Sequence, residues 1–289
     1  MISFDPKDLS TGRLHGYLLS AVAPRPIAFA STVDAEGNPN LSPFSFFNVF
    51  SANPPILVFS PARRVRDNTV KHTLENVEAT REVVINVVNY DIVLQASLSS
   101  TEYPKGVNEF EKSGLTMLKS DKVKPFRVAE SPVQFECKVN DIIAMGSEGG
   151  AGNLVICEVV KLHITEEVLD KDNLIIQEKL DLVARAGGDH YSRARKGFFE
   201  VPKPLQKLGI GVDAMPETVR NSMILTGNDL GMLGNVEVLP TSSEITAFLD
   251  SIGERYPDIK TMTHRQKHKL AKSYLSYGDV ASAWKILLS

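Results

Sequence analysis

Short β-rich segments separated by turn residues dominate the first part of this 289-residue chain and most constrain its fold. Residues 27–33 and 82–89 are rich in β-branched and apolar side chains, residues 34–38 (DAEGN) have turn composition, and residues 55–60 (PILVFS) form a short apolar run. Strands with such short connections pair antiparallel, because a parallel pair needs a long crossover. The sequence therefore predicts a mainly β, antiparallel domain.

The same patterns place the remaining elements of this domain. Further strands are expected over residues 133–139, 141–145, 153–162 and 163–168, with a glycine-rich hairpin tip at 146–152. Peripheral helices are expected over residues 11–20, 90–100 and 108–112.

An arginine-rich stretch, residues 63–66 (RRVR), precedes another predicted helix. Residues 67–69 (DNT) are good N-cap residues, so the helix is expected to start there, and Val70, Leu74 and Val77 give it one apolar stripe. A helix N-terminus beside hydroxyl and guanidinium groups favours phosphate. The alternative is a solvated basic loop with an ordinary cap.

Residues 44–50 alternate phenylalanine with small polar residues. Such a segment suits a flat ligand with polar edges, because serine-rich backbone can donate to ring heteroatoms while phenyl groups cover the ring face. The alternative is that these phenylalanines belong to an ordinary core.

Composition excludes several other classes. A net charge of −3 gives no general attraction to nucleic acid, and no apolar run is long enough to span a bilayer. The N-terminus does not resemble a signal peptide, so a cytoplasmic protein is expected. Cys137 and Cys157 lack metal or redox spacing and are expected to be buried thiols. No metal-ligand set is evident; His264 and His268 have the spacing but no third ligand.

The chain is expected to divide into a β domain over residues 1–204 and an extension over residues 205–289. Within the extension, residues 208–239 are glycine-rich and loop-like. Helices are expected over residues 243–256, 263–277 and 279–288, the last capped by its aspartate.

Five separated motifs resemble the flavin reductase-like family of FMN-binding split barrels, in that family's order. They cover about residues 10–205 and lie at residues 24–32 (PRPIAFAST), 40–48 (NLSPFSFFN), 60–76 (SPARRVRDNTVKHTLEN), 106–110 (GVNEF) and 185–191 (RAGGDHY). The resemblance implies an antiparallel split β-barrel with peripheral helices and a C-terminal helical extension. It also implies bound FMN and a homodimer with flavin at the subunit seam.

By this resemblance, sixteen residues are candidates for binding FMN. Ser31 and Thr32 would lie near the polar edge of the ring or the ribityl chain, and Ser45 with the backbone of residues 44–47 would line the ring. The phosphate would lie in the arginine-rich loop. The candidates are Ser31, Thr32, Ser42, Phe44, Ser45, Phe46, Phe47, Asn48, Ser60, Arg66, Asn68, Thr69, Lys71, Gly188, His190 and Tyr191.

Three more residues are marked by the family pattern. His72 stands where many relatives carry an aspartate, which leaves its role open. Glu102 and Glu109 lie in a region that approaches the flavin or the dimer partner in the family; otherwise they are caps and surface charge. No catalytic acid or base is named, since hydride transfer through a flavin requires none.

Three functions remain open at this point. The favoured one is an FMN-binding oxidoreductase of flavin reductase type, which passes a hydride or electrons from NAD(P)H or another donor through FMN to a flavin or protein acceptor. The second is an electron carrier with tightly held FMN, as in flavoredoxins. The third is a non-enzymatic dimeric flavin-binding module.

Overall fold

The computed structural model describes residues 1–201 and 208–289, which form two compact units, residues 1–199 and 200–289. The predicted boundary after residue 204 lies outside the described residues. Among the described residues, no helix combines the length and apolar character that crossing a bilayer requires.

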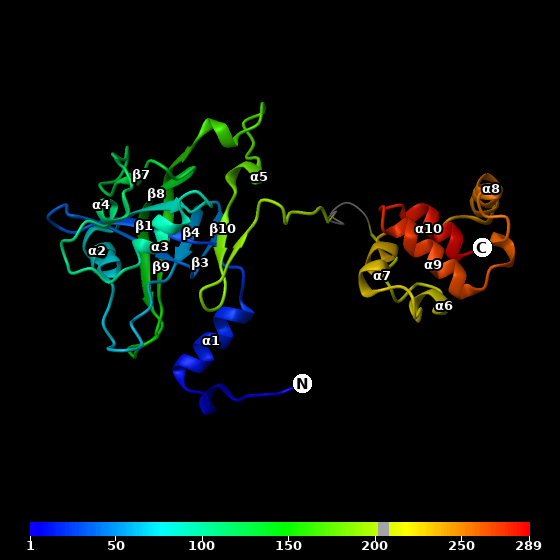
Figure 1. The fold of residues 1–289 in the computed structure, drawn as a ribbon, viewed down its shortest axis with the longest axis horizontal. Helices are drawn as coiled ribbons and strands as arrows, with labels where there is room; N and C mark the ends of the chain where they lie inside the picture. The colour runs from blue at the N-terminus through cyan, green and yellow to red at the C-terminus, as the bar shows by residue number, and fades with distance from the viewer. Residues whose placement is uncertain (202–207) are drawn as a thin grey trace. The chain divides into compact units, whose positions relative to one another are not determined.

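The first unit is built on one antiparallel sheet (Figure 1). Its strand order is β2-β1-β5-β8-β9-β4-β3, so the two edge strands, β2 and β3, are neighbours in sequence. The bounds are β1 Ala28–Val33, β2 Pro39–Phe44, β3 Phe47–Ala52, β4 Pro55–Phe59, β5 Glu82–Val87, β8 Val133–Ala144 and β9 Asn153–Ile164. The prediction of a mainly β, antiparallel domain is confirmed.

Smaller elements surround this sheet. The helical segments of the first unit are η1 Pro6–Asp8, α1 Thr11–Ala21, α2 His72–Thr80, α3 Val93–Leu98, α4 Glu109–Ser113, η2 Glu166–Val168 and α5 Gln177–Leu180. Two short strand pairs complete the unit: β6 Met117–Leu118 with β7 Arg127–Val128, and β10 Val183–Arg185 with β11 Tyr191–Arg193.

β1 is buried along its whole length because helices cover both of its faces. Ala28 and Ala30 belong to a core that includes Leu74 and Val77 of α2, whereas Phe29 packs on the opposite face with Phe110 of α4. Successive side chains of a strand point to opposite faces, so β1 divides these two cores. Cys137 and Cys157 are free and buried in the first core, as predicted.

The long hairpin of β8 and β9 corrects two predictions. Residues 133–145 were expected to form two strands, but β8 runs unbroken to Ala144 because register shifts near Glu136 and Val139 absorb the irregularity. β9 likewise continues to Ile164, and residues 166–168 form the 3₁₀ segment η2 instead of a strand.

The second unit is helical. Its elements are α6 Glu217–Arg220, α7 Gly227–Gly234, α8 Ser242–Ile252, η3 Ile259–Thr261, α9 His264–Leu275 and α10 Val280–Leu287. α9 and α10 pack together, and the buried Trp284 donates its ring N–H to the Leu233 carbonyl at 3.0 Å. The prediction that residues 208–239 form a loop was wrong: a capping box of Thr226 with Asp229 starts α7 despite its glycines.

Candidate functional site

The arginine-rich loop between β4 and α2 is ordered by its own side chains. Asp67 accepts hydrogen bonds from the hydroxyl of Thr69 (2.6 Å) and from its backbone N–H (3.1 Å), and the hydroxyl contributes most to lowering the pKa of Asp67 to about 2. Asn68 adopts a φ of 56°, a left-handed conformation that asparagine tolerates, and its Oδ1 accepts from Arg63 Nε at 2.6 Å. These contacts close a turn.

This turn explains why the helix does not start at residues 67–69, as was predicted. The cap-forming side chains there are used within the turn, and α2 begins only at His72. Lys71 is the N-cap residue, and its side chain makes no capping hydrogen bond. An ammonium group has no acceptor with which to cap a helix.

Lys71 is a partly buried cation at the start of α2. Its Nζ lies 5.5 Å from the centroid of the Phe44 ring, and in the part of the chain that the structure describes no carboxylate approaches it within 4.0 Å. Burial lowers the pKa of Lys71, and the positive charge of Arg64 lowers it further. A cation in this setting is a natural partner for an anionic ligand.

Glu102, between α3 and α4, joins the two nearest guanidinium groups. Its carboxylate contacts Arg64 Nε at 3.1 Å and Arg66 Nη2 at 2.9 Å. The hydrogen bond from Arg66 is the main reason why the pKa of Glu102 is lowered. The side chain of Arg66 is 71% exposed, whereas that of Arg64 is 19% exposed, so Arg64 is the more enclosed of the two.

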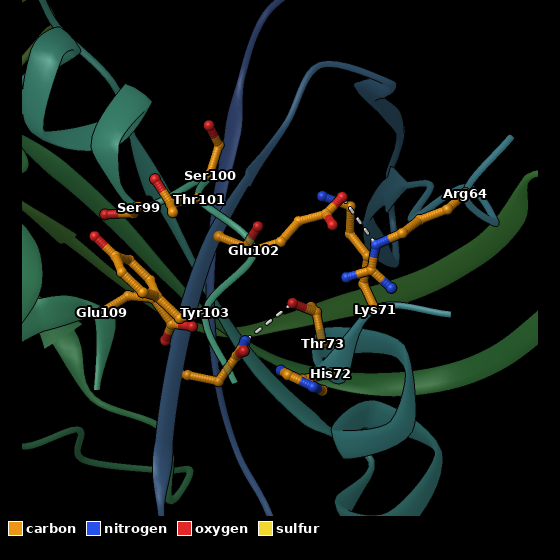
Figure 2. Close-up of a pocket in the computed structure, with 12 residues that line it drawn as sticks. Arg64, Lys71, His72, Thr73, Ser99, Ser100, Thr101, Glu102, Tyr103 and Glu109 are labelled. Carbon is orange, nitrogen blue, oxygen red and sulfur yellow. Dashed lines mark hydrogen bonds and ion pairs between the residues drawn. The ribbon is translucent and has the colours of Figure 1, made fainter. Parts of the chain in front are cut away.

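These groups line a polar hollow of roughly 320 Å³ that is open to solvent (Figure 2). One wall comes from β2, the loop between β4 and α2, and the start of α2: Asn40, Ser42, Arg64, Lys71, His72 and Thr73. The other comes from the α3–α4 connection, residues 99–103, and from Glu109. The hollow thus combines hydroxyl groups with three basic side chains, a donor set that suits a phosphate with a polar tail.

A buried amide network forms the floor beneath Thr73. Asn40 Nδ2 donates to the hydroxyls of Thr32 (3.2 Å) and Thr73 (3.0 Å), and Asn76 Nδ2 donates to Thr32 (3.0 Å). The hydroxyl of Thr32, a predicted site residue, is thereby engaged with β2 and α2. It positions the wall of the hollow and is not among the lining residues.

The other predicted serines take different positions. Ser31 is adjacent to Thr32 on β1 and so faces the opposite side of the sheet; its hydroxyl is fully buried and has no hydrogen-bond partner among the described residues. Ser60 is buried, and its hydroxyl accepts from the Asn153 backbone N–H at 3.0 Å. Of the predicted serines, Ser42 lines the hollow.

The turn between β2 and β3 contains both core and surface residues. Phe44 is buried against Phe59, and Phe47 packs on the same core, whereas Phe46 and Asn48 are exposed. Ser45 Oγ accepts from Arg25 Nε at 3.4 Å. The phenylalanines therefore divide between the core, which was the alternative expectation, and a surface at the sheet edge.

The hairpin of β10 and β11 does not contribute to the lining of this hollow. Gly188 has a φ of 57° at the hairpin tip, His190 Nδ1 lies 3.2 Å from the Gly187 carbonyl oxygen, and the exposed ring of Tyr191 stacks under Arg185. The structure thus brings Ser42 and Lys71 together and leaves Gly188, His190 and Tyr191 elsewhere.

Several lining residues were not among the predicted site residues. Arg64 lies in the arginine-rich motif, but no local pattern distinguishes it from Arg66, which does not line the hollow. Glu109 accepts from the Leu41 backbone N–H at 3.0 Å, and its burial raises its pKa. Glu102 and Glu109 were noted only by family resemblance; their distance in sequence from Lys71 hides their proximity.

Comparison with known proteins defines the class. The family model described as a flavin reductase like domain matches residues 20–181, more than half of the chain. This protein therefore belongs to the flavin reductase-like family. The matched segment lies within the first unit, and the helical unit lies beyond it.

Individual relatives agree with this assignment. An uncharacterized protein from Aquifex aeolicus is 35% identical over 193 residues, which cover 67% of this chain and 96% of that protein. Nitrilotriacetate monooxygenase component B from Bacillus cereus is 28% identical, with a TM-score of 0.65 over 70% of this chain and 98% of that one. A Shewanella frigidimarina protein described as a flavin reductase with a split barrel domain is 27% identical, with a TM-score of 0.59 over 70% and 100%.

Proposed function

We propose that this protein is an FMN-binding oxidoreductase of flavin reductase type, which takes a hydride from NAD(P)H and passes electrons to a flavin or protein acceptor. The observation that carries the proposal is the partly buried Lys71 beside Arg64 in a hydroxyl-lined hollow, with no ion-pair partner for Lys71 among residues 1–201 and 208–289. Family membership supports the flavin, and the donor set suits a terminal phosphate, which favours FMN over a dinucleotide.

Different residues of the hollow would contact different parts of FMN. Lys71 and Arg64 would hold the phosphate, with the hydroxyl of Ser42 as a further donor. Phe44 supports the Lys71 side chain from the core. Bound FMN would supply the hydride chemistry itself, so the protein's part is to hold and orient it.

The proposal extends to closure and assembly. β2 and β3, the two ends of the sheet, are joined only by Ser45 and Phe46, which favours curling of the sheet into a split barrel. The edge strand β3 exposes Val49 (65%) and Phe50 (68%), and an apolar edge of this kind favours pairing with a second copy. We therefore include a homodimer in the proposal.

The visible spectrum of the purified protein tests the function. We expect a yellow protein that releases a small molecule with the mass of FMN. Anaerobic addition of NADH and NADPH in the same cuvette should bleach the flavin with one of them. Bleaching by neither would indicate an electron carrier reduced by another protein. A colourless protein that also ignores added FMN and FAD would contradict the proposal.

A further inference from the structure

The carboxylate of Glu102 lies among the basic side chains of the proposed phosphate subsite. Glu102 points across the hollow toward Arg64 (Figure 2), and its two oxygens contact Arg64 Nε and Arg66 Nη2. An anionic ligand that enters the hollow meets this negative charge, which opposes binding. A carboxylate in this position does not help to bind a phosphate group, so phosphate binding alone does not account for Glu102.

The contacts of Glu102 differ from those of the second carboxylate in the hollow. Glu109 is 5% exposed and accepts from the Leu41 backbone N–H, so it is fixed in the fold. The side chain of Glu102 is 48% exposed, and within residues 1–201 and 208–289 its side-chain partners are the two guanidinium groups. Displacement of Glu102 from the two guanidinium groups therefore breaks no other hydrogen bond or ion pair of its side chain among the described residues.

The donors that Glu102 occupies are the ones a phosphate would use. Arg64 Nη1 already donates to the hydroxyl of Thr69 (2.9 Å) and to the Val70 carbonyl (2.6 Å), which fixes the guanidinium plane. The Nε edge is taken by Glu102. Lys71 and Glu102 line the same hollow, so an anion placed against Lys71 shares that hollow with the Glu102 carboxylate.

We propose that Glu102 is an exchangeable counter-ion: it neutralises Arg64 and Arg66 in the empty protein and is displaced when a phosphomonoester binds. This inference deepens the proposed function and rests on its phosphate subsite. Glu102 thereby lowers the affinity for phosphorylated ligands and leaves that for uncharged analogues unchanged. The residue sets how readily the cofactor is released.

The variant Glu102→Gln tests this role because it keeps the size of the side chain and removes its charge. Dissociation constants for FMN and for riboflavin, which lacks the phosphate, are measured by flavin fluorescence. Binding of inorganic phosphate is measured by calorimetry at constant ionic strength. Glu178→Gln, an exposed residue of α5, is the matched control.

We expect Glu102→Gln to bind FMN about three- to tenfold more tightly, with unchanged riboflavin affinity. The phosphate affinity of Glu102→Gln should rise in parallel, and Glu178→Gln should bind FMN, riboflavin and phosphate with the affinities of the wild type. FMN affinity that is unchanged or weaker in Glu102→Gln, while the wild type binds FMN, overturns the counter-ion role and leaves the proposed function intact. If neither the wild type nor Glu102→Gln binds flavin, the proposed function fails, and the phosphate titration alone tests the counter-ion role. A higher phosphate affinity in Glu102→Gln than in the wild type then supports this role, and an equal or lower affinity overturns it.

Discussion

At the scale of single residues, Lys71 is the group on which the proposed site depends most. The sequence placed it among the phosphate candidates, and the structure adds that it is partly buried, rests on Phe44 and has no counter-ion within 4.0 Å in the described residues. Arg66, also a candidate, is mostly exposed and engaged with Asp67 and Glu102. The enclosed cation is expected to contribute more to phosphate binding than the exposed one.

Lys71→Met removes the charge and keeps the apolar stem. FMN binding should weaken about 10- to 100-fold, the range for a charge-assisted hydrogen bond, whereas riboflavin binding should hardly change. A fluorescence titration with both flavins measures this, with Lys179→Met on α5 as the exposed control. Equal FMN affinity in Lys71→Met and wild type would remove Lys71 from the site.

At the scale of elements, the β8–β9 hairpin supports more than its own ladder. Glu136 on β8 is fully buried, and its carboxylate accepts from the backbone N–H groups of Asp121 (2.9 Å) and Lys122 (2.6 Å) and contacts His163 Nε2 on β9 at 2.7 Å. The side chain thus ties the turn after β6 to the centre of the sheet.

Glu136→Ala should lower the free energy of unfolding of the first unit by about 3 kcal/mol, because it removes a buried carboxylate that accepts from two backbone N–H groups and contacts His163. Urea denaturation followed by far-ultraviolet circular dichroism measures the loss. Trp284, the only tryptophan, reports on the second unit, so its fluorescence midpoint should not move. Glu178→Ala is the control, and an equal loss in both variants would contradict this role.

The edge strand β3 carries the proposed subunit contact. Phe50→Asp places a charge on its exposed apolar face and should convert a dimer of twice 31.8 kDa into a monomer. Light scattering after gel filtration gives the mass, and Leu174→Asp, at an exposed position in the turn between η2 and α5, should remain dimeric. A wild-type protein of monomeric mass would disprove the homodimer, and a dimeric Phe50→Asp would move the interface away from β3.

At the scale of the whole molecule, the chain consists of two units with separate cores. The family match lies in the first, and the core around Trp284 belongs to the second. The hollow is built only from residues of the first unit. A unit with its own core and its own site is expected to fold and bind independently.

A chain ending after Phe199 should therefore stay folded and bind FMN with the affinity of the full-length protein. The test is flavin titration of both proteins, with circular dichroism to verify the fold of the shortened one. A folded but flavin-free shortened protein would show that the second unit contributes to the site.

The sequence by itself determined the class of fold, the free buried cysteines and the motif that carries the basic loop. These follow from local patterns: strand alternation, turn composition and residue spacing act over a few neighbours. The start of α2 was misplaced by the same local reasoning, because the cap-forming side chains of residues 67–69 have two uses, a helix cap and a closed turn, and only their partners decide between them.

Only the tertiary structure decided which residues share the hollow. Glu102 and Arg64 are 38 positions apart in sequence, and their contact depends on the packing of α3 and α4 against β2. Ser31 and Thr32 are adjacent in sequence, yet they face opposite sides of β1 because strand alternation separates them. Long-range contacts of this kind form when the sheet assembles, and local sequence patterns do not predict which distant residues will meet.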